Sequence, residues 1–208
     1  MNTLTSSLEY SHYPVMLSEI IQIASPEKGG LFIDCTFGGG GYSNELLKFP
    51  KTKVIGFDRD EAVISRANEL EKKYQKRFKF YQIKFSELDK ILNKNADTII
   101  FDLGLSSIQL KNLNRGFSFK SKNKLDMAMG LNNISAQEAI NNLSEKHLKL
   151  IIKILGEETE ASNIAKNIIK ARSEKKITKV NELVKIIEKS KKKIFRQKSI
   201  QVQKLFKL

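Results

Sequence analysis

The sequence predicts an α/β fold with a parallel sheet in its first half, followed by an all-helical part. Short apolar runs alternate with helix-like segments over the first 105 residues, and a cluster of glycines follows the first run. After residue 105 the strand-like runs stop and only helical periodicity continues. Alternating strands and helices are typical of parallel strands joined by crossover helices, so we expect an open sheet flanked by helices.

The four predicted strands are short and mostly apolar, as expected of strands that are buried on both faces of a parallel sheet, and only the third alternates in character. They are Leu31–Asp34, Val54–Phe57, Phe78–Ile83 and Thr98–Phe101. The segments between them have the residue spacing of helices and cover roughly Ser43–Lys48, Glu61–Lys73 and Ser86–Leu92.

The second part of the chain begins with a loop at residues 111–130 that is rich in Asn, Lys and Ser. Ser135 then starts a helix, because Glu138 three residues later completes a capping box. Further helices are predicted at His147–Leu155, Glu157–Ala171 and Val180–Ile187, the last with Thr178 as its N-cap. We therefore divide the chain into an α/β half at residues 1–110, a helical domain at 111–190 and a basic tail at 191–208.

The composition argues against several classes of protein. Forty per cent of the residues are hydrophobic, which is enough for a buried core, but no apolar run has the length of a membrane span. Residues 1–10 are polar and lack the basic start and apolar stretch of a secretory signal. Cys35 is the single cysteine, so an internal disulfide and a thiolate metal cluster are excluded. These features predict a cytoplasmic protein with no membrane contact and no catalytic metal.

The net charge of +14 is concentrated towards the C-terminus. Residues 170–208 hold 14 of the 37 basic residues and 3 of the 23 acidic ones. A lysine-rich tail suits a polyanion such as RNA. The alternative is that AT-rich coding DNA, which yields many Lys, Asn and Ile residues, produced this charge without selection for binding.

The glycine cluster at residues 38–41 and Asp58 together predict a nucleotide-like ligand. The glycines stand where the first strand turns into the first helix, so the backbone can approach a ligand closely and the helix start offers N–H donors. Asp58 ends the second strand, 18 residues after Gly40, where a carboxylate can accept hydrogen bonds from both ribose hydroxyls. The alternative role of a helix cap fits Asp60 better than Asp58.

The glycine cluster and Asp58 fit either a nicotinamide dinucleotide or S-adenosylmethionine, and the fourth strand helps to distinguish between these two ligands. A dinucleotide-binding loop usually reads G-x-G-x-x-G, and Ser43 occupies the third glycine position here. The fourth strand ends at Asp102, and Gln109 follows seven residues later. A carboxylate and an amide at the carboxyl end of a strand can accept hydrogen bonds from an amine, which suits methyl transfer to nitrogen better than hydride transfer.

Seven short motifs run in order through most of the chain. They are His12–Leu17, Asp34–Ser43, Gly56–Asp60, Asp102–Leu110, Arg115–Phe119, Leu125–Met127 and Gly156–Glu158. Arg-Gly-Phe-Ser-Phe followed by Leu-Asp-Met is the most specific combination among them. On these motifs the chain resembles the cytidine-N4 methyltransferases of 16S rRNA, of the RsmH or MraW type, over about residues 10–190.

The resemblance implies a Rossmann-like sheet that binds S-adenosylmethionine, with an inserted helical domain that faces RNA. Gly40, Gly41 and Tyr42 are expected to line the amino-acid end of this cofactor. Asp58 is expected to hold the ribose, and Phe85 to flank the adenine. The implied partner is 16S rRNA within the small ribosomal subunit, and a homodimer is compatible with the resemblance.

Asp102 and Gln109 are expected both to bind the cofactor near its methyl group and to serve catalysis. The amine of cytosine is a poor nucleophile, because its lone pair is delocalised into the ring. Asp102 is the expected hydrogen-bond acceptor for this amine and Gln109 is its positioning residue, in a geometry that frees the lone pair. The cytosine is expected to be read in an unstacked state.

Three positions depart from the family pattern. Tyr42 stands where the family usually has histidine, and Ile108 stands where it usually has proline. Ala128 follows Leu-Asp-Met where the family usually has arginine, and a lost arginine weakens a phosphate or carboxylate contact.

The C-terminal residues carry the largest departure, because members of the family continue with a motif like His-Pro-Ala-Thr-Arg and complete the sheet. Back-translation of the tail with a one-base shift can read Lys-Ile-His-Pro-Ser-Thr-Lys-Thr-Phe-Gln-Ala-Leu. We therefore hypothesise a frameshift near Lys191–Lys193, which the coding DNA can test. The strand that ends at Asp102 is then expected to form an open sheet edge, with marginal stability and a tendency to aggregate.

Three alternatives stay open on the sequence. The chain could be a truncated, inactive remnant that keeps only cofactor or RNA binding, a nicotinamide oxidoreductase, or a basic RNA-binding module whose glycine loop is only structural. Cofactor binding separates the first two from the third. The only histidines, His12 and His147, are interpreted as structural or solvated.

Overall fold

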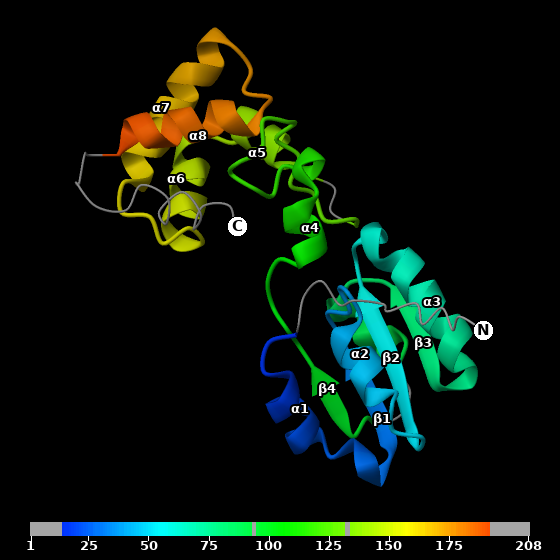
Figure 1. Cartoon of the computed structure of the whole chain (residues 1–208). Helices are drawn as coiled ribbons and strands as arrows, with labels where there is room; N and C mark the ends of the chain where they lie inside the picture. Colours follow the sequence, from blue (N-terminus) through cyan, green and yellow to red (C-terminus); the bar gives the residue numbers. More distant parts are fainter. Residues whose placement is uncertain (1–13, 93–94, 132–133, 192–208) are drawn as a thin grey trace. The chain divides into compact units, whose positions relative to one another are not determined.

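The computed structural model describes residues 14–92, 95–131 and 134–191. These residues divide into two compact units, one up to Ser107 and the other from Ile108 onwards (Figure 1). The first unit contains the sheet and the second is helical. The tail at residues 192–208, with most of the segment assigned to the frameshift, lies outside the described residues.

The sheet of the first unit has four parallel strands in the order β3-β2-β1-β4. Their bounds are Gly30–Asp34 for β1, Thr52–Asp58 for β2, Phe78–Gln82 for β3 and Thr98–Ile100 for β4. The crossover between β1 and β2 contains α2 (Gly41–Leu46), and the one between β2 and β3 contains α3 (Ile64–Tyr74). The predicted α/β fold with a parallel sheet is therefore confirmed.

Both faces of the central strands are covered. Phe32 and Ile33 are neighbours in β1 and are both fully buried, although successive side chains of a strand point to opposite faces of the sheet. Phe57 of β2 is also fully buried. This burial explains why the strands read as continuous apolar runs rather than as alternating ones.

Several helix boundaries differ from the sequence-based expectation. The predicted helix at Ser86–Leu92 is a 3-10 helix, η4, at Phe85–Lys90. The helix expected to start at Glu157 starts only at Ala161, because Glu157 adopts a left-handed φ of 49° that interrupts helical geometry. Thr178 is not an N-cap: Lys179 occupies that position, and the Thr178 N–H donates to Glu182 instead.

Among the described residues, two α-helices were not predicted. They are α1 (Leu17–Ala24) and the short α4 (Ser107–Lys111). The ends of α1 are set by left-handed residues, Met16 with φ 51° and Ser25 with φ 48°. Neither a side-chain N-cap nor a C-terminal glycine marks these ends in the sequence, so the usual start and stop signals are missing.

The second unit is built around four helices and a loop that closes their core. The helices are α5 (Ala136–Asn142), α6 (Glu145–Ile154), α7 (Ala161–Glu174) and α8 (Val180–Ser190). The capping box predicted for α5 is confirmed: Glu138 N–H donates to Ser135 Oγ, and Ser135 N–H donates to the Glu138 carboxylate. Leu125, from the preceding loop, is fully buried against Ile164 and other residues of this core.

The two most specific motifs of the sequence, Arg115–Phe119 and Leu125–Met127, contact each other in this loop. The Arg115 guanidinium donates to the carbonyl oxygen of Ala128 at 2.8 Å, and Met127 N–H donates to the carbonyl oxygen of Arg115 at 2.9 Å. Gly116 has a φ of 78°, and a Cβ there would lie 2.6 Å from the carbonyl oxygen of Lys124. These motifs therefore have a structural role, and position 128 contributes its backbone to it.

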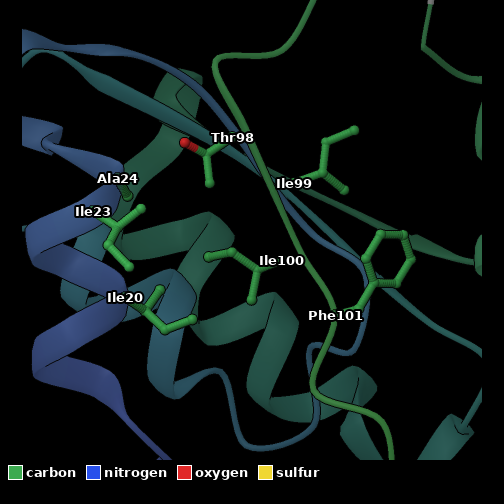
Figure 2. Close-up of a pocket in the computed structure, with 7 residues that line it drawn as sticks. All are labelled: Ile20, Ile23, Ala24, Thr98, Ile99, Ile100 and Phe101. Atoms are coloured by element: carbon green, nitrogen blue, oxygen red, sulfur yellow. The ribbon is translucent and has the colours of Figure 1, made fainter.

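Strand β4 forms an edge of the sheet, as the sequence predicted. Among the described residues it pairs only with β1. Ile99 is 45% exposed and Leu103, just beyond the strand, is 72% exposed. Between β4 and α1 lies an apolar pocket of about 320 Å³, with Ile20 and Ile23 of α1 among its lining residues (Figure 2).

Within the described part of the chain, every helix falls short of the length and apolarity that a membrane span requires.

Replacing Ile99 by lysine is expected to raise the solubility of the chain several-fold, because a charged residue on a sheet edge opposes edge-to-edge pairing. Dynamic light scattering over a concentration series measures the effect. Ile154→Lys is the matched control, since Ile154 is also exposed but lies on α6. Equal effects of the two substitutions would show that general surface polarity, rather than the strand edge, limits solubility.

Candidate functional site

Three aspartates gather at the carboxyl ends of the parallel strands, where open α/β sheets bind their ligands. Asp34 ends β1 and Asp58 ends β2, while Asp102 follows β4 by two residues. The backbone N–H of Asp102 donates to Thr36 Oγ1 at 2.8 Å. This bond ties the loop after β4 to the loop after β1, so both loops border one site.

The glycine loop is shaped partly by packing and partly by open space. Gly40 has a φ of 74°, and a Cβ there would lie 2.7 Å from the Phe37 ring. A Cβ on Gly41 would overlap the ring of Pro14. At Gly39 and at Gly104 a Cβ would meet nothing within 4 Å. A ligand can therefore approach the backbone at these last two positions, which lie in the loops after β1 and β4.

Asp34 anchors the glycine loop through hydrogen bonds. Its side chain is fully buried, and it accepts hydrogen bonds from Ser43 Oγ at 2.7 Å and from Thr36 N–H at 3.4 Å. Burial raises the pKa of Asp34 to about 6, against the lowering effect of the Ser43 hydrogen bond. No role was predicted for Asp34 from the sequence, although an acidic residue that ends an apolar run shortly before a glycine loop was a usable signal.

Asp58, at the end of β2, lies beside the first glycine of this loop. Its Oδ2 accepts from Gly38 N–H at 2.8 Å and its Oδ1 accepts from Asp60 N–H at 2.9 Å. Burial raises the pKa of Asp58 above its ordinary value. Backbone hydrogen bonds from Asp60, Gly38 and Arg59 oppose this rise in the pKa. The carboxylate is therefore fixed in place, and it keeps acceptor capacity for a hydroxyl group. Asp60 caps the next helix by accepting from Ala62 N–H, as expected.

Tyr42 connects three segments that are distant in sequence. Its hydroxyl donates to the carbonyl oxygen of Val15 at 2.6 Å and lies 3.4 Å from Asp102 Oδ2. The side chain is 6% exposed, and burial, followed by the Asp102 charge, raises the pKa of Tyr42 to about 12. Tyr42 was expected at the cofactor from the family resemblance, whereas its contact with Asp102 was not predicted.

The remaining two expected site residues, Phe85 and Gln109, differ in their exposure to solvent. Phe85, at the start of η4, is 45% exposed and meets Phe101 edge-to-face at 5.5 Å between ring centroids. An exposed aromatic ring of this kind can pack against a base. Gln109 is buried and lies on α4, in the part of this helix that belongs to the second unit, so its role beside Asp102 stays a prediction.

The residues of the first unit fit S-adenosylmethionine. A carboxylate with acceptor capacity for a hydroxyl, an exposed aromatic ring and an open stretch of glycine backbone suit its ribose, adenine and amino-acid end. Among the described residues, no three His, Cys, Asp or Glu side chains are grouped so as to hold a metal ion.

Comparison with known proteins gives one consistent result. Residues 9–207 match the MraW methylase family. The chain is 44% identical to ribosomal RNA small subunit methyltransferase H of Orientia tsutsugamushi strain Boryong, over 86% of this chain and 58% of that protein. It is 40% identical to the proteins of the same name from Rickettsia massiliae and Rickettsia canadensis, over 86% and 88% of this chain. The chain thus spans about three-fifths of the length of these relatives.

Proposed function

The chain belongs to the MraW methylase family, and on this premise we propose that it is an S-adenosylmethionine-dependent methyltransferase. Its proposed substrate is the N4 amine of a cytidine in 16S rRNA, within the small ribosomal subunit. The observation that carries the proposal is the pairing of Asp58 with an open glycine loop at the carboxyl ends of β1 and β2. A cytoplasmic location follows from the proposal, because ribosomal subunits are there.

The first task of these residues is to bind the cofactor. Asp58 accepts hydrogen bonds from the two ribose hydroxyls while the Gly38 and Asp60 amides hold its carboxylate in place. Phe85 presents its exposed ring to the adenine. Gly40 and Gly41 let the loop turn closely beneath the amino-acid end of the cofactor.

The second task is to orient the amine that receives the methyl group. S-adenosylmethionine supplies a methyl group on a positively charged sulfur. Asp102 accepts a hydrogen bond from the cytosine amine and so fixes the direction of its lone pair. The hydrogen bond from Asp102 N–H to Thr36 Oγ1 holds Asp102 at a fixed position relative to the glycine loop. Gln109 is proposed to position the same amine.

Calorimetric titration with S-adenosylmethionine tests the cofactor site. The wild-type chain is expected to bind saturably, and Asp58→Ala to bind about 10- to 100-fold more weakly, because it loses hydrogen bonds to a charged acceptor. Glu27→Ala is the matched control: Glu27 is exposed and lies before the amino end of β1, whereas the site lies at the carboxyl ends of the strands. Absence of saturable binding by the folded wild-type chain would contradict the proposal.

A second candidate is a chain that binds the cofactor without transferring methyl groups. One observation favours it: among the described residues, β4 is a partly exposed edge of the sheet. Incubation with labelled S-adenosylmethionine and small subunits lacking the methyl group separates the two candidates. Transfer that is lost in Asp102→Ala supports the enzyme, whereas saturable binding without transfer supports the binding protein.

A further inference from the structure

Two lysines stand directly opposite each other in the second unit. Lys124, in the loop before α5, and Lys179, in the connection between α7 and α8, form an isolated antiparallel bridge. Two backbone hydrogen bonds flank this pair, one donated by Leu125 N–H at 2.9 Å and the other by Val180 N–H at 3.1 Å. In a pair flanked in this way the Cα atoms lie roughly 4.5 Å apart and the two side chains leave the backbone on the same face.

Both side chains of this lysine pair face solvent. Their neighbours Leu125 and Val180 are fully buried, and successive side chains of extended backbone point to opposite sides. Both lysines are exposed, and neither forms a salt bridge within the described part of the chain. Like charges directly opposite each other are destabilising, so the pair lowers the stability of the fold.

Further lysines extend the pair on both segments. Residues 120–124 and 175–179 hold six lysines and no acidic residue, and all six lysines are exposed. They are Lys120, Lys122 and Lys124 in the loop and Lys175, Lys176 and Lys179 in the connection. We call these two segments the basic surface. Glu182 of α8 offsets part of this positive charge, although its carboxylate is already bound by the N–H groups of Thr178 and Lys179.

Hydrogen bonds from the rest of the second unit hold both segments in place. Ser121 is buried, and its hydroxyl donates to the carbonyl oxygen of Leu113 at 2.7 Å and accepts from Asn123 N–H at 3.0 Å. The side chain of Asn141 donates to the carbonyl oxygen of Ile177 at 2.7 Å and accepts from Ile177 N–H at 3.0 Å. The lysines therefore stand on fixed backbone, which reduces the entropy lost when a ligand binds.

We propose that the basic surface binds the sugar-phosphate backbone of RNA, with one phosphate group shared by Lys124 and Lys179. A phosphate between two ammonium groups replaces their repulsion by two charge-assisted hydrogen bonds. The identity of this RNA as the 16S rRNA substrate rests on the proposed function.

Two other anionic partners fit the basic surface less well. A membrane-binding surface presents apolar side chains beside its basic ones, whereas Leu125, Ile177 and Val180 beside these lysines are buried. Protein interfaces are depleted in lysine and enriched in arginine and aromatic residues, and residues 120–124 and 175–179 contain neither of these. Lysine contacts to phosphate oxygens, by contrast, are common where proteins bind nucleic acids.

The test is fluorescence anisotropy of the intact chain with two labelled RNAs of equal length, a 16S rRNA fragment that contains the proposed target cytidine and its scrambled sequence. Lys124→Gln/Lys179→Gln is expected to weaken binding of both RNAs about tenfold, because phosphate contacts carry no sequence information. The slope of log affinity against log salt concentration should become shallower by about 1 to 2. Lys166→Gln/Lys170→Gln is the matched control, since it removes two exposed lysines of α7, and it should change the affinity by less than about threefold.

Two further measurements separate binding from folding. Lys124→Gln/Lys179→Gln is expected to raise the midpoint of thermal unfolding, followed by circular dichroism, by about 1–3 °C, because like charges no longer face each other. Lys124→Arg/Lys179→Arg keeps both charges and should bind RNA within about threefold of wild type. A titration with polyglutamate tests for an acidic protein partner and is expected to show no binding at the RNA concentrations used.

Equal weakening of RNA binding by the two glutamine double variants would overturn the basic surface, because net charge alone would then account for binding. Wild-type affinity in Lys124→Gln/Lys179→Gln would also overturn it. Polyglutamate that binds as tightly as RNA would overturn the RNA assignment in favour of an acidic protein. RNA binding that depends on the lysine pair, in a chain that does not bind S-adenosylmethionine, would support the basic surface and refute the proposed function.

Discussion

Replacing Gly40 by alanine is expected to lower the free energy of unfolding of the first unit by about 2–4 kcal/mol. Two effects add at this position. Gly40 has a φ of 74°, which is unfavourable for any residue with a Cβ. A Cβ would also lie 2.7 Å from the Phe37 ring, and that ring is buried against Phe78 and Phe80 and has little room to move.

Hydrogen exchange of the β1 and β2 segments at increasing urea concentrations measures this change within the first unit. Gly39→Ala is the matched control, because its Cβ would meet nothing within 4 Å and its φ is not in the left-handed region. We expect that control to stay within about 0.5 kcal/mol of wild type. Similar losses in the two variants would mean that the loop tolerates no side chain at all, whatever its packing.

The fold was predictable from the sequence where burial dictates the pattern. Phe32 and Ile33 are buried on opposite faces of the sheet, so the strand is a continuous apolar run that periodicity alone detects. Helix α1 was not predictable in the same way, because left-handed Met16 and Ser25 set its ends. Glu157 likewise breaks a helical pattern that its sequence would continue. None of these three residues is a glycine or an asparagine, so the sequence carries no local signal for these conformations.

The site was predictable to the extent that chain geometry fixes it. Asp58 was found because a residue ending a strand next to the glycine loop must lie beside that loop. The contact of Tyr42 with Asp102 joins residues 60 positions apart, and no periodicity reports such a contact. The support of the loop by Asp34 was missed for a different reason: a carboxylate at the end of a strand looks the same in sequence whether it faces a ligand or is buried.

The free energy of unfolding of the first unit is expected to fall as pH rises from about 4 to about 6. Burial raises the pKa of Asp34 from 3.8 to about 6, so the folded state holds the proton over a range in which the unfolded state has released it. Since the folded state then binds more protons, stability decreases with rising pH. The full change is roughly 3 kcal/mol at about 1.4 kcal/mol per pKa unit, and the raised pKa of Asp58 acts in the same direction.

Asp34→Asn should flatten this decrease, as measured by hydrogen exchange of β1 and β2 between pH 4 and 6.5 after correction for intrinsic rates. Glu138 and Glu182 in the second unit have lowered pKa values and therefore the opposite pH dependence. Their contributions are the same in the variant and in the wild type, so they cancel in the comparison. Glu27→Gln serves as a charge-matched control and should leave the slope unchanged. An identical slope in Asp34→Asn and wild type would exclude Asp34 as its source.

The same substitution should separate stability from binding. Asp34 accepts hydrogen bonds from Ser43 and Thr36 through its two oxygens, whereas an asparagine has one oxygen and an amide that cannot accept. We therefore expect Asp34→Asn at pH 7.5 to be no less stable than wild type, since it buries no charge, yet to bind S-adenosylmethionine several-fold more weakly because the glycine loop loses part of its anchor. A buried carboxylate that opposes folding near neutral pH is then explained by the loop geometry it maintains.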